Sequence, residues 1–375
     1  MHPASTWGNR EHRGGVVEVS GRPLRRDIMR ALTVNPGRPH SLSLDEVPPP
    51  PKSDGAVLVH TTALGICGTD REIIEGLYGE APEGTDRLII GHESLGHVEE
   101  APAECGAARG DLVVGIVRRP DPVPCPACGA GEWDMCRNGQ YTERGIKQRN
   151  GYGSEQFRVE PDFLIKLDPA LGFIGVLLEP ASVVAKAWEH TLRIGARSAS
   201  WRPRTALVTG AGPVGLLAAL MGAQHGLEMH VFDRVQSGAK PALVQALGAT
   251  YHTGSLGNLC PDVVIECTGA TPVVVDVIGR TAASGIVCLA GVSSGGHKIQ
   301  FDIGDLNRTL VLENDMVFGS VNANRRHYRD AARALSRADR RWLTGLISRR
   351  VPLARWREAF ERRDNDIKVV VDFTV

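Results

Sequence analysis

The chain has 375 residues and carries 43 Lys and Arg against 43 Asp and Glu, so its formal net charge at pH 7 is zero. Single hydrophobic cores stop growing at about 250–300 residues, so more than one domain is expected. The charge balance argues against a partner that is a nucleic acid or an anionic membrane surface, and no apolar run approaches the roughly 20 residues of a membrane span.

The opening residues, 1–28, are polar and rich in Arg, Gly and His, and we expect them to form a flexible tail. From Met29, short apolar segments alternate with Pro- and Gly-rich turns. This rhythm predicts short strands in a barrel-like, β-rich unit. The segments are RALTV, LSLDEV, AVLVHTTALGI and, further on, DLVVGIV.

A thiol, an imidazole and a carboxylate follow one another in the motifs GICGTD and IIGHESLGHV. Zinc binds Cys, His and carboxylate ligands, and a catalytic zinc site keeps one position open. Cys67 and His92 are therefore candidate ligands, Glu93 follows directly, and Glu179 in LLEPAS can complete a Cys/His/Glu set. Each residue alone could be a core or surface residue; together they predict a catalytic zinc site suited to hydroxyl chemistry.

Three further cysteines lie in a Pro- and Gly-rich loop, where Cys125 and Cys128 form a CxxC and Cys136 follows after seven residues. The loop has too few apolar residues to form its own core, so a tetrahedral metal is expected to hold it. Asp121, four residues before Cys125, is the candidate fourth ligand. The alternative is three reduced cysteines on an exposed loop. Eight cysteines in the whole chain are too few for a disulfide scaffold, which favours a reducing cytoplasm.

The segment TALVTGAGPVGLLAALMGAQHGLEMHVFDR is typical of a buried strand, a glycine turn, a helix and a second strand. Its glycines match GxGxxG in the context that dinucleotide binding requires, because the turn follows a strand and opens a helix. Such glycines let the backbone approach a pyrophosphate, and the helix N-terminus offers it free N–H groups. The candidate cofactor-binding residues of this turn are Gly210, Gly212, Pro213, Val214 and Gly215.

An acidic residue, Asp233, follows 18 residues after Gly215 at the end of the second strand. A carboxylate there accepts bonds from the ribose hydroxyls and repels a 2'-phosphate, which favours NAD over NADP. The neighbouring Arg234 weakens this preference, because a guanidinium can pair with the same phosphate. The sequence thus predicts NAD or NADP, with a lean to NAD.

Strand and helix alternate through the second half, which predicts a doubly wound parallel sheet. Two amphipathic helices are expected, over PASVVAKAWEHTLRI after Glu179 and over RRHYRDAARALSR from Arg325. We interpret TLVLENDMVFGSV as a late pair of strands. The last segment, IKVVVDFTV, is one more strand, which we assign back to the first domain.

In this order, from about Met29 to the C-terminus, GICGTD with GHE, the three-cysteine loop, the LEP motif and GAGPVG resemble the zinc-dependent medium-chain dehydrogenases. GTDREIIEGLYG, TERGI and FGSVNANRRHY resemble the glucose 1-dehydrogenases among them. The resemblance implies an α/β fold with the active site in a cleft between two domains. These are a GroES-like β-rich catalytic domain, residues 29–182 with 323–375 returning to it, and a Rossmann doubly wound parallel-sheet domain, residues 183–322.

The implied reaction transfers a hydride from C1 of D-glucose, or of a related aldose, to NAD or NADP and gives gluconolactone. The resemblance implies Cys67, His92 and Glu179 as zinc ligands and Glu93 as a second carboxylate that approaches the metal in some states. It also implies that Thr69 relays the substrate proton. The remaining implied roles are Asp70 as a partner of the metal site, and Glu143 and Asn322 as ligands of the sugar hydroxyls.

Two positions depart from the family pattern. The first cysteine of the four-cysteine loop falls on Pro122, and a sugar-contacting asparagine of some relatives falls on Val117. Two other functions therefore stay open: a zinc-dependent polyol or amino-alcohol dehydrogenase of the sorbitol or threonine type, and a non-catalytic zinc- and nucleotide-binding protein. The resemblance also implies a homo-oligomer, a dimer or a tetramer.

Overall fold

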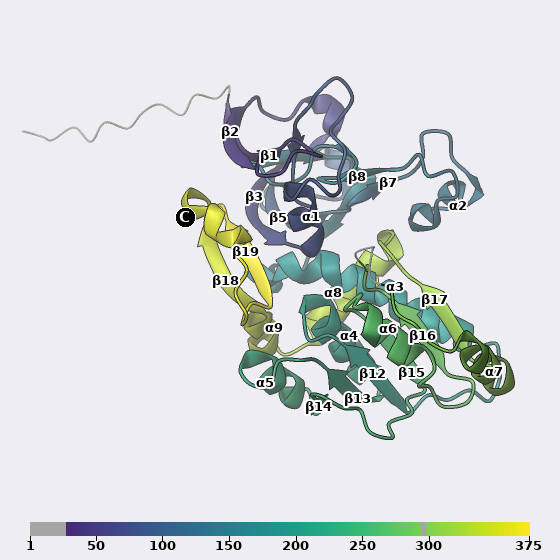
Figure 1. Cartoon of the computed structure of the whole chain (residues 1–375). Coiled ribbons are helices and arrows are strands. Elements are labelled where there is room, and N and C mark those ends of the chain that lie inside the picture. The colour runs from purple at the N-terminus through teal and green to yellow at the C-terminus, as the bar shows by residue number, and fades with distance from the viewer. Residues whose placement is uncertain (1–27, 294–297) are drawn as a thin grey trace, which may run out of the picture.

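The computed structural model describes residues 28–293 and 298–375 (Figure 1). The expected tail, residues 1–28, lies outside the described residues apart from Ile28. Two sheet systems organise the fold, one built mainly from the N-terminal half and one from the segment after residue 204. In Figure 1 the purple and blue strands form the upper part of the molecule and the green strands the lower part.

The upper part is β-rich, as predicted. Its largest sheet has seven strands, in the order β11-β6-β5-β3-β19-β18 with β10 also paired to β3, and two three-stranded sheets accompany it, β2-β1-β4 and β7-β8-β9. Its strands are β1 (Met29–Val34), β2 (Ser43–Val47), β3 (Val57–Ile66), β4 (Leu88–Ile89), β5 (Glu93–Glu100), β6 (Leu112–Gly115), β7 (Arg118–Arg119), β8 (Thr142–Arg144), β9 (Gln148–Arg149), β10 (Gln156–Val159), β11 (Leu164–Lys166), β18 (Ile347–Pro352) and β19 (Lys368–Asp372).

The strands β18 and β19 come from the far end of the chain. β19 pairs antiparallel with β3, and β18 pairs parallel with β19. The yellow pair therefore lies beside the first strands of the chain in Figure 1. The short helices of this part are α1 (Gly68–Ile74), α2 (Pro126–Gly129) and α10 (Arg357–Phe360), with 3₁₀ turns at Lys52–Asp54, Ala103–Cys105, Trp133–Met135, Pro161–Phe163 and Leu353–Arg355.

The lower part is a six-stranded parallel sheet in the order β14-β13-β12-β15-β16-β17, and it confirms the predicted doubly wound sheet. Its central strands are buried and apolar, which is typical of parallel sheets that helices cover on both faces. The elements are β12 (Thr205–Thr209), α4 (Pro213–Gln224), β13 (Glu228–Phe232), α5 (Ala239–Ala246), β14 (Thr250–His252), β15 (Val263–Glu266), α6 (Thr271–Ile278), β16 (Ile286–Leu289), α7 (Ile303–Glu313) and β17 (Met316–Gly319).

Two of the later elements test the sequence interpretation directly. The predicted helix from Arg325 is α8 (Arg325–Arg337), followed by α9 (Arg340–Leu346). The predicted strand pair over TLVLENDMVFGSV is wrong in its first half, because α7 occupies Ile303–Glu313 and only β17 is a strand. Asp302 caps α7 by accepting from Asp305 N at 3.0 Å, and Asn314 ends it with a left-handed φ of 57°. These end signals outweigh the β propensity of the Thr, Val and Leu residues between them.

The helix α3 (Leu178–Gly195) packs between the two sheets and carries the predicted amphipathic pattern. Together with the 3₁₀ turn Pro169–Leu177 it is long and apolar enough to cross a membrane, which the search for apolar runs in the sequence did not anticipate. However, 72% of the residues in its most apolar 18-residue window are buried inside the fold. An apolar stretch that is mostly enclosed by protein is typical of a core helix rather than of a membrane span.

Candidate active site

The antiparallel pair β3 and β5 brings the first two predicted metal ligands together. Cys67 follows the last residue of β3 and stands at the N-cap of α1, and His92 directly precedes β5. Ligand atoms of Cys67, His92 and Glu93 lie within 4.8 Å of one another. A Cβ at Gly65, which pairs with Glu93 across the ladder, would lie 2.0 Å from Glu93 Oε2, so only glycine leaves room for this carboxylate.

Asp70 holds this cluster from the first turn of α1. Its Oδ2 accepts a hydrogen bond from Cys67 N at 2.8 Å, and its Oδ1 lies 3.4 Å from His92 Nδ1. Burial lowers the pKa of His92, but the Asp70 carboxylate outweighs burial and raises this pKa well above its usual value. A carboxylate at one ring nitrogen of a histidine leaves the other nitrogen for a metal. Thr69 lies half-buried beside it, in the same turn.

Glu93 forms a buried ion pair that the sequence interpretation missed. Lys368 Nζ, from the first residue of β19, lies 2.6 Å from both carboxylate oxygens of Glu93 and donates to Ile66 O at 3.2 Å. Both side chains are buried. Burial lowers the pKa of Lys368, but Glu93 outweighs this and raises it, so the pair is charged. Glu93 therefore already has a cation.

Glu179, the first acid of α3, forms no such ion pair with any residue that the structure describes. It is buried, and it stands outside the group of three whose ligand atoms lie within 4.8 Å. Burial raises its pKa to about 7; His92 and Lys368 lower it, whereas Glu93 and Asp70 raise it further. When His92 is neutral, as a metal ligand has to be, a buried acid that interacts with the carboxylates of Glu93 and Asp70 needs more positive charge than one lysine supplies. The donor set of Cys67, His92 and Glu179 fits a zinc ion, which supplies that charge.

The predicted cofactor turn lies between β12 and α4. Gly210 has a φ of 89°, which a side chain would strain. Gly212 is the N-cap of α4, and a Cβ added there meets no heavy atom within 4 Å, so its surface is open. At Gly215 a Cβ would lie 1.8 Å from Gly210 O. Pro213 begins the helix and Val214 is half-buried. The turn fits the approach of a pyrophosphate.

Asp233 follows β13 and faces this turn. Its Oδ2 accepts from Ala211 N at 2.6 Å and its Oδ1 from Val235 N at 2.9 Å, so it also fixes the loop beside the glycines. Lys240 Nζ lies 3.5 Å from Asp233 Oδ2, and Arg234 is exposed. Two cations thus accompany the acid, which weakens the repulsion that a 2'-phosphate would meet.

Glu143 and Asn322, the two predicted sugar ligands, lie side by side although 179 residues separate them. Asn322 Nδ2 donates to Glu143 Oε1 at 2.7 Å, and Arg118 Nε donates to the same oxygen at 3.0 Å. Arg118 and Glu143 are direct partners across the strands β7 and β8. Among residues 28–293 and 298–375, the polar partners of the Glu143 side chain all contact Oε1, which leaves Oε2 as the oxygen for a ligand. Val117, next to Arg118, is buried.

The sulfur atoms of Cys125, Cys128 and Cys136 lie within 4.8 Å of one another, in the loop around α2 that projects to the right in Figure 1. The backbone N–H groups of Arg137 and Cys128 donate to Cys125 Sγ and lower the pKa of this thiol to about 6. Asp121 is buried and its Oδ2 has no hydrogen-bond partner among the described residues, but it stands outside the group of three. Three thiols and an unpaired carboxylate oxygen fit a tetrahedral metal.

Two family models match the chain. The one described as "Alcohol dehydrogenase GroES-like domain" covers residues 53–169, and the one described as "Glucose dehydrogenase C-terminus" covers residues 172–373. The glucose 1-dehydrogenase of Methanocella arvoryzae is 41% identical over 361 residues, which cover 92% of this chain and 99% of that protein. The glucose 1-dehydrogenase of Thermoproteus tenax is 41% identical over 353 residues, with the same coverage.

The fold also matches a solved structure of glucose dehydrogenase from Haloferax mediterranei in complex with NADP, Zn and gluconolactone. The TM-score is 0.85 at 30% sequence identity, and the match covers 92% of this chain and 100% of that one. The predicted fold class, a GroES-like β-rich domain with a Rossmann sheet, is thereby confirmed.

Proposed function

The chain belongs to the glucose 1-dehydrogenase family of zinc-dependent medium-chain dehydrogenases, and on this basis we propose that it transfers a hydride from C1 of D-glucose, or of a related aldose, to NAD or NADP and gives gluconolactone. The observation that carries the proposal is the group of Cys67, His92 and Glu93, whose ligand atoms lie within 4.8 Å of one another, together with the Glu93–Lys368 pair and the buried acid Glu179 that interacts with the same residues. Burying this uncompensated negative charge costs free energy unless a cation binds there, so a protein that no longer bound a metal at this site would have no reason to keep the arrangement.

Cys67, His92 and Glu179 would hold the zinc, which when bound polarises a hydroxyl oxygen and lowers its pKa toward neutrality. Asp70 keeps His92 in the orientation that frees its second ring nitrogen. Thr69, half-buried one position before Asp70, would accept the proton of the substrate hydroxyl and pass it outward.

The sugar itself would be recognised by Glu143 and Asn322. Glu143 Oε2 would accept a hydrogen bond from a sugar hydroxyl, because Oε1 is already held by Arg118 and Asn322. A site built to bond a hydroxyl rejects analogues that lack it, because its own polar groups are then left unpaired. This pair therefore favours a polyhydroxylated substrate over a simple alcohol.

NAD and NADP would both bind at the turn from Gly210 to Gly215, with the pyrophosphate at the N-terminus of α4 and the adenosine ribose at Asp233. The preference for NAD stays a prediction that rests on the Asp233 carboxylate, and the positive charges of Arg234 and Lys240 weaken it.

At the cysteine loop, we propose a structural zinc held by Cys125, Cys128 and Cys136 with Asp121 as the fourth ligand. The unpaired Asp121 Oδ2 supports it.

The division into residues 29–182 with 323–375 and residues 183–322 also stays a proposal, supported by the two separate sheets and by the pairing of β19 with β3. A cytoplasmic location is supported by the eight cysteines, all among the described residues and all free.

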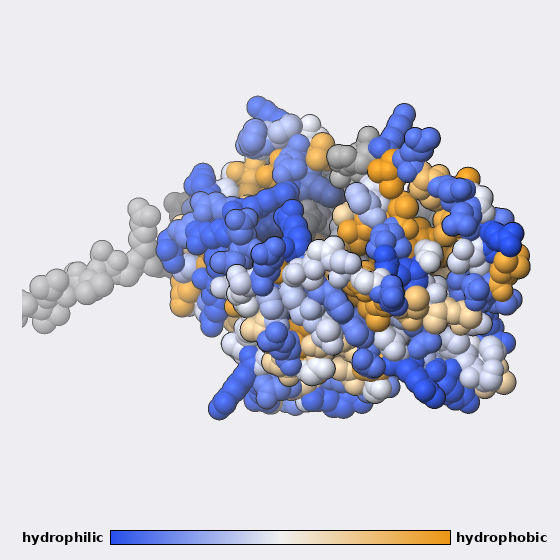
Figure 2. All heavy atoms as spheres, turned by 60° about the horizontal axis from the view of Figure 1, so that its bottom comes forward, coloured by the Kyte–Doolittle hydropathy of each residue, from blue (hydrophilic) through white to orange (hydrophobic). Residues whose placement is uncertain are grey.

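We also propose a homo-oligomer, a dimer or a tetramer. β17 is an edge strand of the parallel sheet, and the neighbouring residues Ile303, Val311 and Leu312 of α7 are each more than 60% exposed. Figure 2 shows apolar side chains gathered on the right of the molecule, the side that carries α7 and β17 in Figure 1. An open edge next to exposed apolar side chains is typical of a surface that a second copy covers.

The test is a substrate panel of D-glucose, other aldoses, sorbitol and threonine, each measured with NAD and with NADP. The proposal expects D-glucose or a related aldose to have the highest kcat/KM, and Glu143→Gln to reduce kcat/KM for the sugar by about tenfold or more. Reduction with sorbitol or threonine alone would move the substrate to the polyol or amino-alcohol alternative. No turnover with any substrate by zinc-loaded protein would favour a non-catalytic binder.

A further inference from the structure

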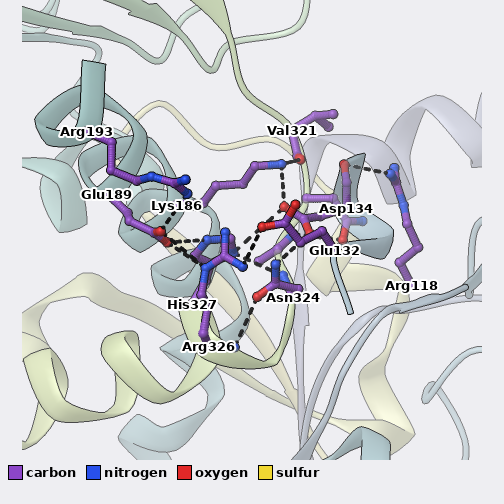
Figure 3. Close-up of polar contacts among 12 residues, drawn as sticks. Arg118, Glu132, Asp134, Lys186, Glu189, Arg193, Val321, Asn324, Arg326 and His327 are labelled. Carbon is purple, nitrogen blue, oxygen red and sulfur yellow. Dashed lines mark hydrogen bonds and ion pairs between the residues drawn. The ribbon is translucent and has the colours of Figure 1, made fainter. Parts of the chain in front are cut away.

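A buried ion pair outside the metal site joins the cysteine loop to the segment that carries Asn322. Lys186 reaches from α3, and its Nζ lies 2.8 Å from Asp134 Oδ2 and donates to Val321 O at 2.9 Å. Figure 3 shows Lys186 pointing between these two groups. Both ionic side chains are at most 2% exposed. Asp134 lies in the loop two residues before Cys136, so a single lysine connects this loop to residue 321.

Asn324 makes the second link. Its Nδ2 donates to Asp134 Oδ1 at 2.7 Å, while its Oδ1 accepts from Arg326 N at 3.1 Å and caps α8. Only a residue with both a donor and an acceptor can make these two bonds at once, which explains asparagine at this N-cap. Asp134 therefore has a partner on each carboxylate oxygen, and both partners fix the segment between β17 and α8.

Arg118 links Asp134 to Glu143, the other proposed ligand of the sugar. It donates through Nη1 to Asp134 O at 3.4 Å and through Nε to Glu143 Oε1 at 3.0 Å. Glu143 in turn accepts from Asn322, which stands in a left-handed conformation with a φ of 60°. A left-handed conformation is uncommon outside glycine and persists where the surrounding contacts fix it, so the contacts of Val321 and Asn324 on either side of Asn322 set where its amide lies.

A buried ion pair such as this one adds little net stability, because the desolvation penalty offsets most of the attraction between the two charges. Burial disfavours the charged forms of both residues; it lowers the pKa of Lys186, and the bonds from Lys186 and Asn324 to Asp134 still keep the pKa of that acid low. The main effect of the pair is therefore to fix the positions of the two segments that it joins.

We propose that Lys186, Asp134 and Asn324 are positioning residues for the sugar site, which hold Asn322 and, through Arg118, the Glu143 carboxylate in the arrangement that binds the substrate. The inference rests on the proposed function, because it assigns these residues to the substrate side of that reaction. It also makes the cysteine loop part of the support of the sugar site, since Asp134 belongs to that loop.

The main test is the double variant Lys186→Met with Asp134→Leu. Removing one charge would leave the other unpaired in the interior, whereas removing both avoids an unpaired charge and loses only the bonds to Asn324 Nδ2 and Val321 O. We expect unchanged zinc content and unchanged KM for NAD(P), with KM for D-glucose raised by about tenfold or more. Discrimination between D-glucose and aldoses that lack or invert one hydroxyl is expected to fall in parallel, which a merely structural role would not cause.

Asn324→Ser is the second variant, because serine keeps the cap of α8, while its hydroxyl is one bond shorter than the Nδ2 group that donates to Asp134. It is expected to raise KM for D-glucose in the same way, at a melting temperature close to that of the wild type. The matched control is Glu132→Gln, which weakens the half-exposed contact of the same loop with Arg326 at 3.1 Å but leaves residues 321–324 untouched. Exposed pairs of this kind contribute little, so its KM is expected to be unchanged.

Unchanged KM and unchanged sugar discrimination in a folded double variant or in Asn324→Ser would overturn the positioning role. An equal rise for sugar and cofactor would overturn it too, since it would indicate general loosening. The proposed function fails separately, if the wild type does not oxidise D-glucose. If it oxidises another polyol instead, that polyol takes the place of D-glucose in the same comparison.

Discussion

The three glycines of the turn before α4 are expected to respond differently to alanine, because the structure gives each a different reason to lack a side chain. Gly212→Ala places a methyl group where nothing lies within 4 Å, on the surface that we propose faces the cofactor. Gly215→Ala places it 1.8 Å from Gly210 O and 2.9 Å from the carbonyl carbon of the same residue. The methyl group of Gly212→Ala would obstruct the bound cofactor, whereas the methyl group of Gly215→Ala would clash with the backbone of the turn.

The magnitudes follow from these contacts. At Gly215 the backbone of the turn has to move by more than about 1 Å to restore van der Waals distances, and such overpacking costs about 1–3 kcal/mol. At Gly212 the loss of stability is limited to the difference between glycine and alanine at an N-cap, about 1 kcal/mol or less. Obstruction of the pyrophosphate by the new methyl is expected to raise the Kd of the cofactor by at least about tenfold, or 1.4 kcal/mol.

The assay combines titration of NADH and NADPH into each variant with denaturant unfolding. Gly226→Ala, just after the other end of α4, is the control, because its φ of 80° makes alanine unfavourable there although it lies away from the turn. We expect Gly226→Ala to lose stability and keep cofactor affinity, and Gly212→Ala to do the opposite. A Gly212→Ala variant that binds both cofactors as tightly as the wild type would refute this placement of the pyrophosphate.

Three further changes test other parts of the account. Lys368→Met leaves Glu93 buried without a partner and is expected to reduce the free energy of unfolding by about 3–5 kcal/mol; a loss below about 1 kcal/mol in denaturant unfolding would contradict a charged pair. Cys67→Ala is expected to lose one zinc and all turnover together, and turnover in the metal-free variant would contradict the zinc role. Burial raises the pKa of Glu160, but its contacts with Arg119 and Arg149 outweigh burial and lower it to about 2. Because this folded pKa is below the usual 4.5, the stabilisation is complete above about pH 4.5 and is lost as the pH falls toward 2. Glu160→Gln should therefore cost about 1–2 kcal/mol at pH 7, discounted because the side chain is a third exposed, and the difference from the wild type should shrink in unfolding curves at pH 3; a constant difference would argue against the pairing.

The local parts of the site could be predicted from the sequence because their residues are close together in it. The candidate metal ligands next to β3 and β5 stand in two short motifs, and the glycine turn is one continuous segment between a strand and a helix. Asp233 was identifiable because a fixed spacing separates it from that turn. In each case, residues that are close together in the sequence are also close together in the structure, or are separated by a fixed spacing.

The residues that the sequence did not indicate are those whose partners are distant in the chain. Lys368 begins an ordinary apolar strand, and its partner Glu93 lies 275 residues away. Asn324 and Asp134 are 190 residues apart, and nothing in either segment indicates the other. The error at α7 has another cause, since TLVLE favours a strand by composition, and the caps Asp302 and Asn314 that decide for a helix lie outside that short run.

The most direct test of the central claim is the rate of nicotinamide reduction by the purified protein with D-glucose, measured with NAD and NADP separately, before and after removal of zinc by a chelator. The account predicts glucose-dependent reduction that disappears with the zinc and returns when zinc is added back, while Cys67→Ala stays inactive under both conditions. Glucose oxidation that continues in zinc-free protein would contradict the assignment of Cys67, His92 and Glu179 as the ligands of a catalytic metal.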